Sequence, residues 1–182
     1  MNLQEKYQKE IIPKLKEELK KKNSQAVPKV VKVVINVGLK DALSDKKIID
    51  IVREDLSLIS GQKPVITKAR VAIAGFKLRA KDEIGLKVTL RGKRMFDFLE
   101  KFLTIVLPRV RDFHGLSINS IDHNGNISIG ISEYIVFPEI DASKIEKLRG
   151  LEITIVTSAR NKDEGKILFE LLGVPFQKVK KS

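Results

Sequence analysis

Residues 85–92, GLKVTLRG, decide the fold class of this chain. Apolar residues alternate with polar ones, so Lys87, Thr89 and Arg91 point to one side of a strand and the apolar side chains point to the other. Such alternation is typical of an antiparallel sheet that packs one face on a core and leaves the other face open. The polar side is also cationic, so the open face is a candidate binding surface.

Further segments indicate strands of the same sheet. KVVKVVINVG (29–38) is rich in β-branched residues and is expected to bury one side, with Lys32 and Asn36 on the other. The shorter candidates are PVIT (64–67), ISIGI (127–131) and LEITIVTS (151–158).

Helical patterns lie between and around these strands. Asn2 is expected to cap a first helix, and Pro13 to bend it because proline lacks a backbone donor. A third helix is expected to end before Pro108, and a last helix is followed by Gly173.

The second helix is expected to begin at Ser44 or Asp45 and to stop at Gly61. Its expected core side consists of Ile48, Ile51, Val52, Leu56 and Ile59. Together the elements predict an α+β fold, formed as a single domain over residues 1–182. It is an antiparallel-rich sheet with helices packed on one face and a long basic hairpin loop projecting from it.

That loop is TKARVAIAGFKLRAKDEIG (67–85), which has neither a helical period nor strand alternation. Its middle has few groups to bury, while ordering a backbone costs about 1–2 kcal/mol per residue. We therefore expect the loop to be mobile in the free protein and ordered by a partner. The alternative is a surface loop without a role, although long loops in compact domains are usually functional or disordered.

The charge of the chain favours a polyanionic partner. Thirty-five Lys and Arg against 23 Asp and Glu give a formal charge of +12 and a pI of about 9.8. Residues 61–95 hold ten basic and two acidic side chains, whereas residues 96–176 are mildly acidic. A single charged run is as often a solvated face as a binding site, but this concentration favours a binding surface. The charge alone is equally compatible with rRNA, tRNA and DNA.

Several function classes fit the sequence poorly. There is no cysteine, which excludes disulfides and thiolate metal sites, and His114 and His123 are the only histidines, so neither a metal nor a cofactor is expected. No P-loop, GxGxxG, GxSxG or HExxH motif is present, so we do not expect an enzyme. No apolar run approaches the roughly 20 residues of a membrane span. The N-terminus has no apolar signal region, and the first helix lacks the aromatic residues typical of a membrane-surface helix.

The polar sheet face suits the backbone of folded RNA. Lysine and arginine bind phosphates, while Asn and Thr reach 2′-hydroxyl groups, and no aromatic ladder is present for stacking single-stranded bases. The segments SGQKP (60–64) and TKAR (67–70) are expected at the same edge. The candidate RNA-binding residues are Lys32, Asn36, Gln62, Lys63, Thr67, Lys68, Arg70, Lys87, Thr89 and Arg91.

Seven segments carry a resemblance to a known family: SGQKPVITKAR, AGFKLR, IGLKVTLRGKRMFDFLE, PRVRDFHGL, GNISIGI, FPEID and RGLEITI. In order and spacing they resemble large-subunit ribosomal protein five in its bacterial form, over essentially the whole chain. The resemblance implies a structural protein of the large ribosomal subunit, in the cytoplasm, with no catalytic residues.

The resemblance also implies partners. These are 5S rRNA, which the protein helps to anchor in the central protuberance, 23S rRNA, P-site tRNA, neighbouring large-subunit proteins and small-subunit ribosomal protein thirteen. The sheet face would then hold 5S rRNA. The loop would contact tRNA through Gly75, Phe76, Lys77, Arg79 and Lys81. The implied intersubunit bridge consists of Arg109, Arg111, Asp112, His114, Glu133, Glu139 and Asp141.

Overall fold

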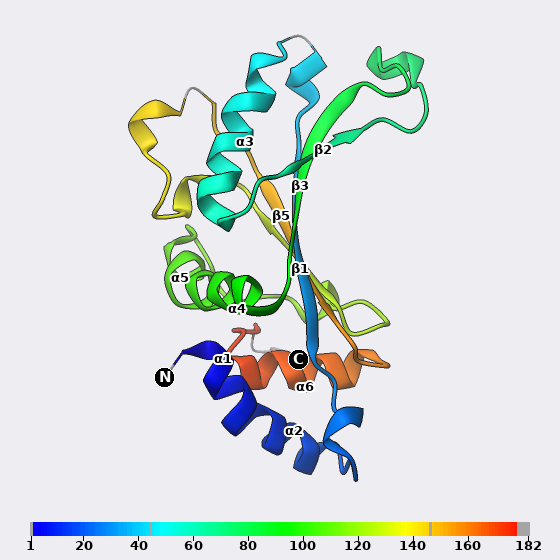
Figure 1. The fold of residues 1–182 in the computed structure, drawn as a ribbon, viewed down its shortest axis with the longest axis vertical. Coiled ribbons are helices and arrows are strands. Elements are labelled where there is room, and N and C mark those ends of the chain that lie inside the picture. The colour runs from blue at the N-terminus through cyan, green and yellow to red at the C-terminus, as the bar shows by residue number, and fades with distance from the viewer. Residues whose placement is uncertain (1, 44, 146, 178–182) are drawn as a thin grey trace, which may run out of the picture. The chain divides into compact units, whose positions relative to one another are not determined.

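The structure, a computed structural model, describes residues 2–43, 45–145 and 147–177, with only the backbone of Phe76 and Lys144 (Figure 1). Its sheet is five-stranded and antiparallel, in the order β2-β3-β1-β5-β4. The strands are β1 (Val30–Gly38), β2 (Val65–Lys68), β3 (Glu83–Leu90), β4 (Ile127–Ile131) and β5 (Leu151–Thr157). Helices accompany the sheet, so the predicted α+β class is confirmed.

The chain divides into two compact units. The first comprises residues 1–33, 91–129 and 154–182, and the second comprises residues 34–90 and 130–153. Strands β1, β4 and β5 each run from one unit into the other. That residues 1–182 act as a single RNA-binding domain stays a prediction.

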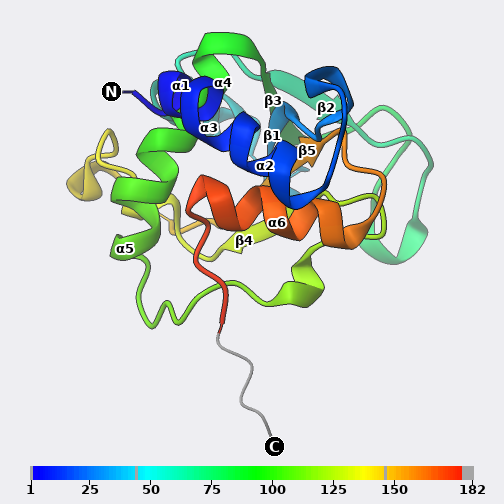
Figure 2. The same ribbon diagram turned by 90° about the horizontal axis from the view of Figure 1, so that it is seen from below.

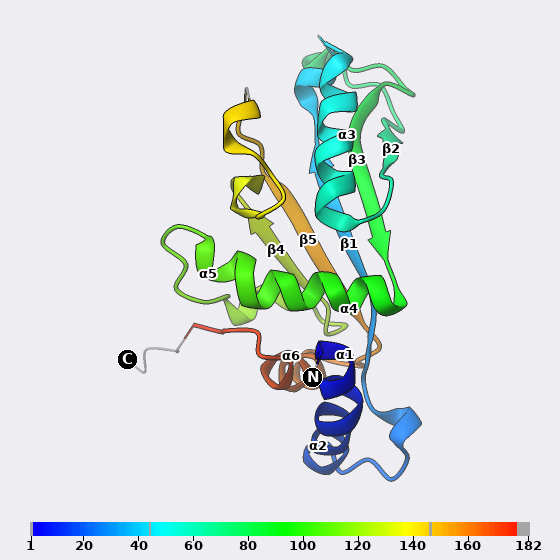
Figure 3. The same ribbon diagram turned by 60° about the vertical axis from the view of Figure 1, so that its left-hand side comes forward.

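In the second unit, helix α3 (Lys47–Ser60) covers one face of β3 and its neighbours (Figure 3). Leu86, Val88 and Leu90 of β3 are buried on this face, as the alternation predicts. Gly61 follows the helix in a left-handed conformation, with φ of 66°, and its N–H donates to the Ser57 carbonyl at 2.9 Å. This confirms the expected stop.

The core side of α3 differs in part from the prediction. Ile49, Val52, Leu56 and Ile59 are buried, whereas Ile48 is half-buried and Ile51 is exposed. The apolar arc of the helix is wider than its contact with the sheet, so hydrophobic spacing alone selects the wrong edge of that arc. At the start of the helix, the Asp45 carboxylate accepts the Lys47 N–H, while Ser44 lies outside the described residues.

The first unit contains the remaining helices. They are α1 (Leu3–Lys6), α2 (Ile12–Glu18), α4 (Gly92–Lys101), α5 (Leu107–Arg109) and α6 (Lys162–Leu172). The Asn2 side chain accepts the Glu5 N–H at 2.9 Å, which confirms the first cap. None of the helices in the described part of the chain is both long and apolar enough to cross a membrane.

Two π-helical segments precede the prolines. They are η1 (Tyr7–Ile11), before Pro13, and η5 (Phe102–Val106), before Pro108. Proline cannot donate to the carbonyl four residues back, and its ring clashes there, so wider turns before it relieve the conflict. The prediction that the third helix ends before Pro108 is therefore wrong, because helical backbone continues through Pro108 to Arg109.

Short 3₁₀ turns complete the chain. They are η2 (Ser24–Ala26), η3 (Lys40–Leu43), η4 (Ala74–Phe76), η6 (Ile118–Ser120), η7 (Tyr134–Val136) and η8 (Ala142–Lys144).

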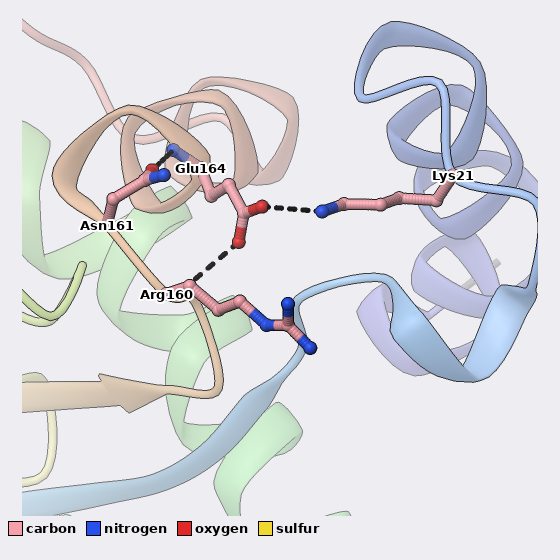
Figure 4. A network of polar contacts seen from close by, with 4 residues as sticks. All are labelled: Lys21, Arg160, Asn161 and Glu164. Carbon is pink, nitrogen blue, oxygen red and sulfur yellow. Dashed lines mark hydrogen bonds and ion pairs between the residues drawn. The ribbon is translucent and has the colours of Figure 1, made fainter.

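A polar network joins α2 to α6 within the first unit (Figures 2 and 4). Lys21 Nζ donates to Glu164 Oε1 at 2.8 Å, and the Arg160 N–H donates to Glu164 Oε2 at 3.1 Å. The Asn161 side chain caps α6 by accepting the Glu164 N–H at 2.8 Å. One carboxylate thus holds both the entry of α6 and the residues that follow α2.

Candidate nucleic-acid interface

The open face of β1, β3 and β2 carries the expected polar side chains. Asn36 and Lys87 are exposed and Thr89 is half-buried, all opposite the face that α3 covers. In the antiparallel hairpin of β2 and β3, Val65 pairs with Lys87. Directly paired residues of two strands point to the same side of a sheet, so Val65 lies on the open face beside Lys87 and is exposed there. The sequence pattern did not predict Val65 as part of this face. Only the hairpin register places it there.

Gly85 allows the strands to pack closely at this face. A Cβ atom on Gly85 would lie 2.6 Å from the Val37 carbonyl oxygen and 2.8 Å from Thr67 Oγ1. Thr67 is the pairing partner of Gly85, so its hydroxyl occupies the space that a side chain on β3 would fill. Gly85 is itself buried, so glycine is required here by the close packing of β1, β2 and β3.

The two cations at the ends of the predicted face belong to the first unit. Lys32 is half-buried in β1 and, four residues before Asn36, shares its side of the strand. Arg91 is exposed and is the N-cap residue of α4.

The segment before and along β2 has internal contacts as well as exposed cations. Gln62 Nε2 donates to the Thr89 carbonyl at 3.2 Å and ties the turn after α3 to β3. Lys68 Nζ lies 3.4 Å from Glu83 Oε1 in an ion pair that is partly exposed and so contributes little to stability. The other predicted cations here, Lys63 and Arg70, are exposed.

The basic loop between β2 and β3 continues their antiparallel pairing (Figure 1). The Ala69 N–H donates to the Asp82 carbonyl at 2.8 Å, and Ile73 and Leu78 exchange backbone hydrogen bonds of 2.9 and 3.1 Å. Asp82 Oδ2 accepts the Arg79 N–H at 2.7 Å, so this carboxylate closes a turn within the loop. The loop therefore has internal order in this structure, and its mobility in solution stays a prediction.

Three cations of the loop border a hollow of about 450 Å³. Lys77, Arg79 and Lys81 of the loop and Lys46, the residue before α3, line it together with the acidic residues Asp82 and Glu83. Lys77 and Lys81 have positive φ angles, of 52° and 72°. The sequence analysis missed Lys46, because only tertiary folding brings it to the loop. Gly75 has open space around it, and the side chain of Phe76 lies outside the described atoms.

The expected bridge residues fall into separate groups. The basic group, Arg109, Arg111, Asp112 and His114, is exposed on and after α5 in the first unit. The acidic group is Glu133, Glu139 and Asp141, which are exposed in the second unit. Within each unit the group is accessible to a partner.

Perturbed pKa values have structural causes here. Burial raises the pKa of Tyr7 to about 12, and burial together with the Asp55 carboxylate raises the pKa of Tyr134 to about 12. The Lys147 ammonium, hydrogen-bonded to Asp41, lowers the pKa of that carboxyl. Across residues 2–43, 45–145 and 147–177, no group of three or more His, Cys, Asp or Glu is placed to hold a metal ion.

Comparisons with known proteins identify the family. Residues 23–79 match the family model for ribosomal protein L5, and residues 83–176 match the model for the C-terminus of the same ribosomal protein family. The chain belongs to the ribosomal protein L5 family. It is 53% identical over 176 residues to large ribosomal subunit protein uL5 of Thermoanaerobacter sp. (strain X514), covering 97% of this chain and 98% of the relative.

Other relatives agree with this assignment. The uL5 proteins of Carboxydothermus hydrogenoformans and Chloroflexus aurantiacus are each 51% identical, over 97% of this chain and 98% of their own length. The predicted bacterial-type resemblance is confirmed, and so is the prediction of a structural ribosomal protein rather than an enzyme. The match to each of these uL5 proteins therefore spans both units of the chain.

Proposed function

We propose that this chain is a structural protein of the large ribosomal subunit, in the cytoplasm, that binds 5S rRNA on the open face of its sheet. Family membership supports the location in the large subunit. The rRNA and the neighbouring proteins of the large subunit are then the partners of this chain. On the same reasoning the protein anchors 5S rRNA in the central protuberance, beside 23S rRNA. The basic loop contacts P-site tRNA, and the exposed acidic and basic groups contact small-subunit protein thirteen.

One observation carries the 5S rRNA assignment. In the second unit, the sheet face opposite α3 exposes Asn36 and Lys87 around the close approach at Gly85 and Thr67. Lysine supplies a phosphate contact, while amide and hydroxyl groups supply contacts to ribose. The carboxylate at the start of β3, Glu83, is paired with Lys68 and so repels phosphate less than a free acid would.

The salt dependence of 5S rRNA binding tests this face. Lys87→Ala should flatten the log–log salt slope by roughly 0.7–0.9, the value for one lost phosphate contact. Asn36→Ala should weaken affinity at a nearly constant slope, because its amide is neutral. Lys166→Ala, which removes a half-buried lysine on α6 in the other unit, is the control. If Lys87→Ala and Lys166→Ala give the same slope, Lys87 does not touch phosphate.

The tRNA assignment is supported by the excess of positive charge at the hollow beside the loop, where four cations accompany Asp82 and Glu83. Asp82 accepts the Arg79 N–H and Glu83 pairs with Lys68, so both carboxylates already have partners within the protein. Replacing residues 74–82 with a short Gly-Ser turn should lower the affinity of assembled ribosomes for P-site tRNA. Binding of 5S rRNA should survive, because the sheet face is untouched. Loss of 5S rRNA binding with unchanged tRNA affinity would mean that the loop serves the other RNA.

A further inference from the structure

Helix α3 has a second apolar stripe beside its buried one. Its apolar members are Ile48, Ile51 and Leu58, each one residue before a buried core position of the helix. Asp55 lies between them on the same side and interrupts the stripe. Ile51 and Leu58 remain 48% and 61% exposed. An exposed apolar stripe next to a core stripe marks a surface that another element can cover.

This stripe forms one wall of a groove of about 330 Å³ within the second unit. The other wall consists of Tyr134, residues 139–141, Ile145 and Arg149, from the part of the chain that is yellow beside α3 in Figure 1. Tyr134 is buried, and its hydroxyl donates to Asp55 Oδ2 at 2.9 Å, which ties the two walls together. Ile140 and Ile145 add apolar surface from the second wall. The groove is thus held in shape by contacts of the protein itself.

The charge of the groove opposes that of the chain. Among the described side chains that line it, four are carboxylates, Glu54, Asp55, Glu139 and Asp141, and one is a cation, Arg149. The Asp141 carboxylate also accepts hydrogen bonds from the Ser143 N–H and hydroxyl group. In a protein of charge +12, this acidic lining repels an RNA backbone and attracts a cationic group. The apolar walls require in addition a large apolar side chain.

We propose that this groove binds a basic segment of a partner protein, with an apolar side chain inserted against Ile51 and Leu58. The inference deepens the proposed intersubunit bridge, on which it rests, because Glu139 and Asp141 line the groove. It adds α3 to that contact and makes the contact partly apolar. At protein interfaces most of the binding energy comes from a few side chains that are fully desolvated near the centre of the contact.

A site-specific cross-link tests the occupant directly, because the chain has no native cysteine. Leu58→Cys, labelled with a photoreactive maleimide and assembled into large subunits, should cross-link to a basic small-subunit protein when purified small subunits are added. Ile105→Cys, at an exposed apolar position of η5 outside the groove, is the matched control and should not. A cross-link from Leu58→Cys to RNA or to a second copy of this chain overturns the proposal. The absence of any cross-link from Leu58→Cys overturns it as well.

Serine variants separate the groove from the bridge. Ile51→Ser with Leu58→Ser should weaken subunit association about fivefold or more, as for loss of an apolar anchor, without changing its salt dependence. Glu139→Gln with Asp141→Asn should weaken association and flatten its salt dependence. If only the charge variants act, the groove proposal fails and the bridge stands. If neither pair acts, the proposed bridge fails as well. For every variant, incorporation of 5S rRNA into the assembled large subunit is measured as the control for correct folding.

Discussion

Replacing Glu164 by glutamine should destabilise the protein by about 2 kcal/mol, because hydrogen bonds to charged groups contribute roughly 1.5–3 kcal/mol. The side chains of Lys21 and Glu164 are only 26% and 11% exposed, so solvent screens their 2.8 Å contact weakly. Glutamine has the same shape as glutamate, and its side-chain carbonyl can still accept one hydrogen bond. It has no negative charge, however, so the Lys21 ammonium loses its counter-charge. Urea unfolding at neutral pH measures the difference.

The control is Glu170→Gln on the same helix. Its ion pair with Lys166 spans 3.7 Å, and the two side chains are 50% and 38% exposed. Loss of such a surface pair should change stability by less than about 0.5 kcal/mol. Equal destabilisation by the two variants would refute the argument that the network of Figure 4 joins α2 to α6.

The pH dependence has a definite sign. The Lys21 hydrogen bond lowers the pKa of Glu164 below its ordinary value of 4.5, in spite of the opposing effect of burial. A carboxyl whose pKa is lower in the folded state stabilises that state above the unfolded pKa, and this stability is lost as the pH falls through the folded pKa. The gap between wild type and Glu164→Gln should therefore be full at neutral pH and should narrow on acidification below 4.5. A constant gap would contradict this assignment.

Three further outcomes are expected. Gly165→Ala, which would normally stabilise a helix, should lower the thermal midpoint at a cost of roughly 1–3 kcal/mol, since its Cβ would lie 2.6 Å from the Gly125 backbone; a raised midpoint contradicts the close approach. Asp82→Ala should increase amide exchange at the Arg79 N–H and weaken tRNA binding although it removes a negative charge; tighter binding would show that repulsion dominates. Asp122→Ala should cost about 1–2 kcal/mol in urea unfolding, because its carboxylate accepts two backbone N–H groups of its turn, and it should leave RNA binding unchanged.

Much of the fold could be predicted from local pattern. Alternation at Leu86, Val88 and Leu90 and the β-branched run of β1 identify strands, because side-chain direction along a strand is set locally. The caps at Asn2 and Gly61 are likewise local, since each acts on backbone groups within four residues.

The candidate interface could be predicted in composition but not in its internal contacts. The cationic character of residues 61–95 is visible in the sequence. The contacts of Gln62 with Thr89 and of Lys68 with Glu83 depend on the hairpin register, which strand alternation leaves open. Lys46 joins the loop cations only through the packing of α3.

The sequence by itself determined the five strands, most of the helical segments, the sign and location of the charge, and the family; the end of the third helix was predicted wrongly. Tertiary structure alone decided which edge of the apolar arc of α3 faces the core, leaving Ile51 and Leu58 to line an acidic groove. It also decided that Asp82 closes a turn and that Glu164 joins α2 to α6. The physical reason is that periodicity fixes the direction of a side chain relative to its own element. The partner that it meets depends on how elements distant in sequence pack.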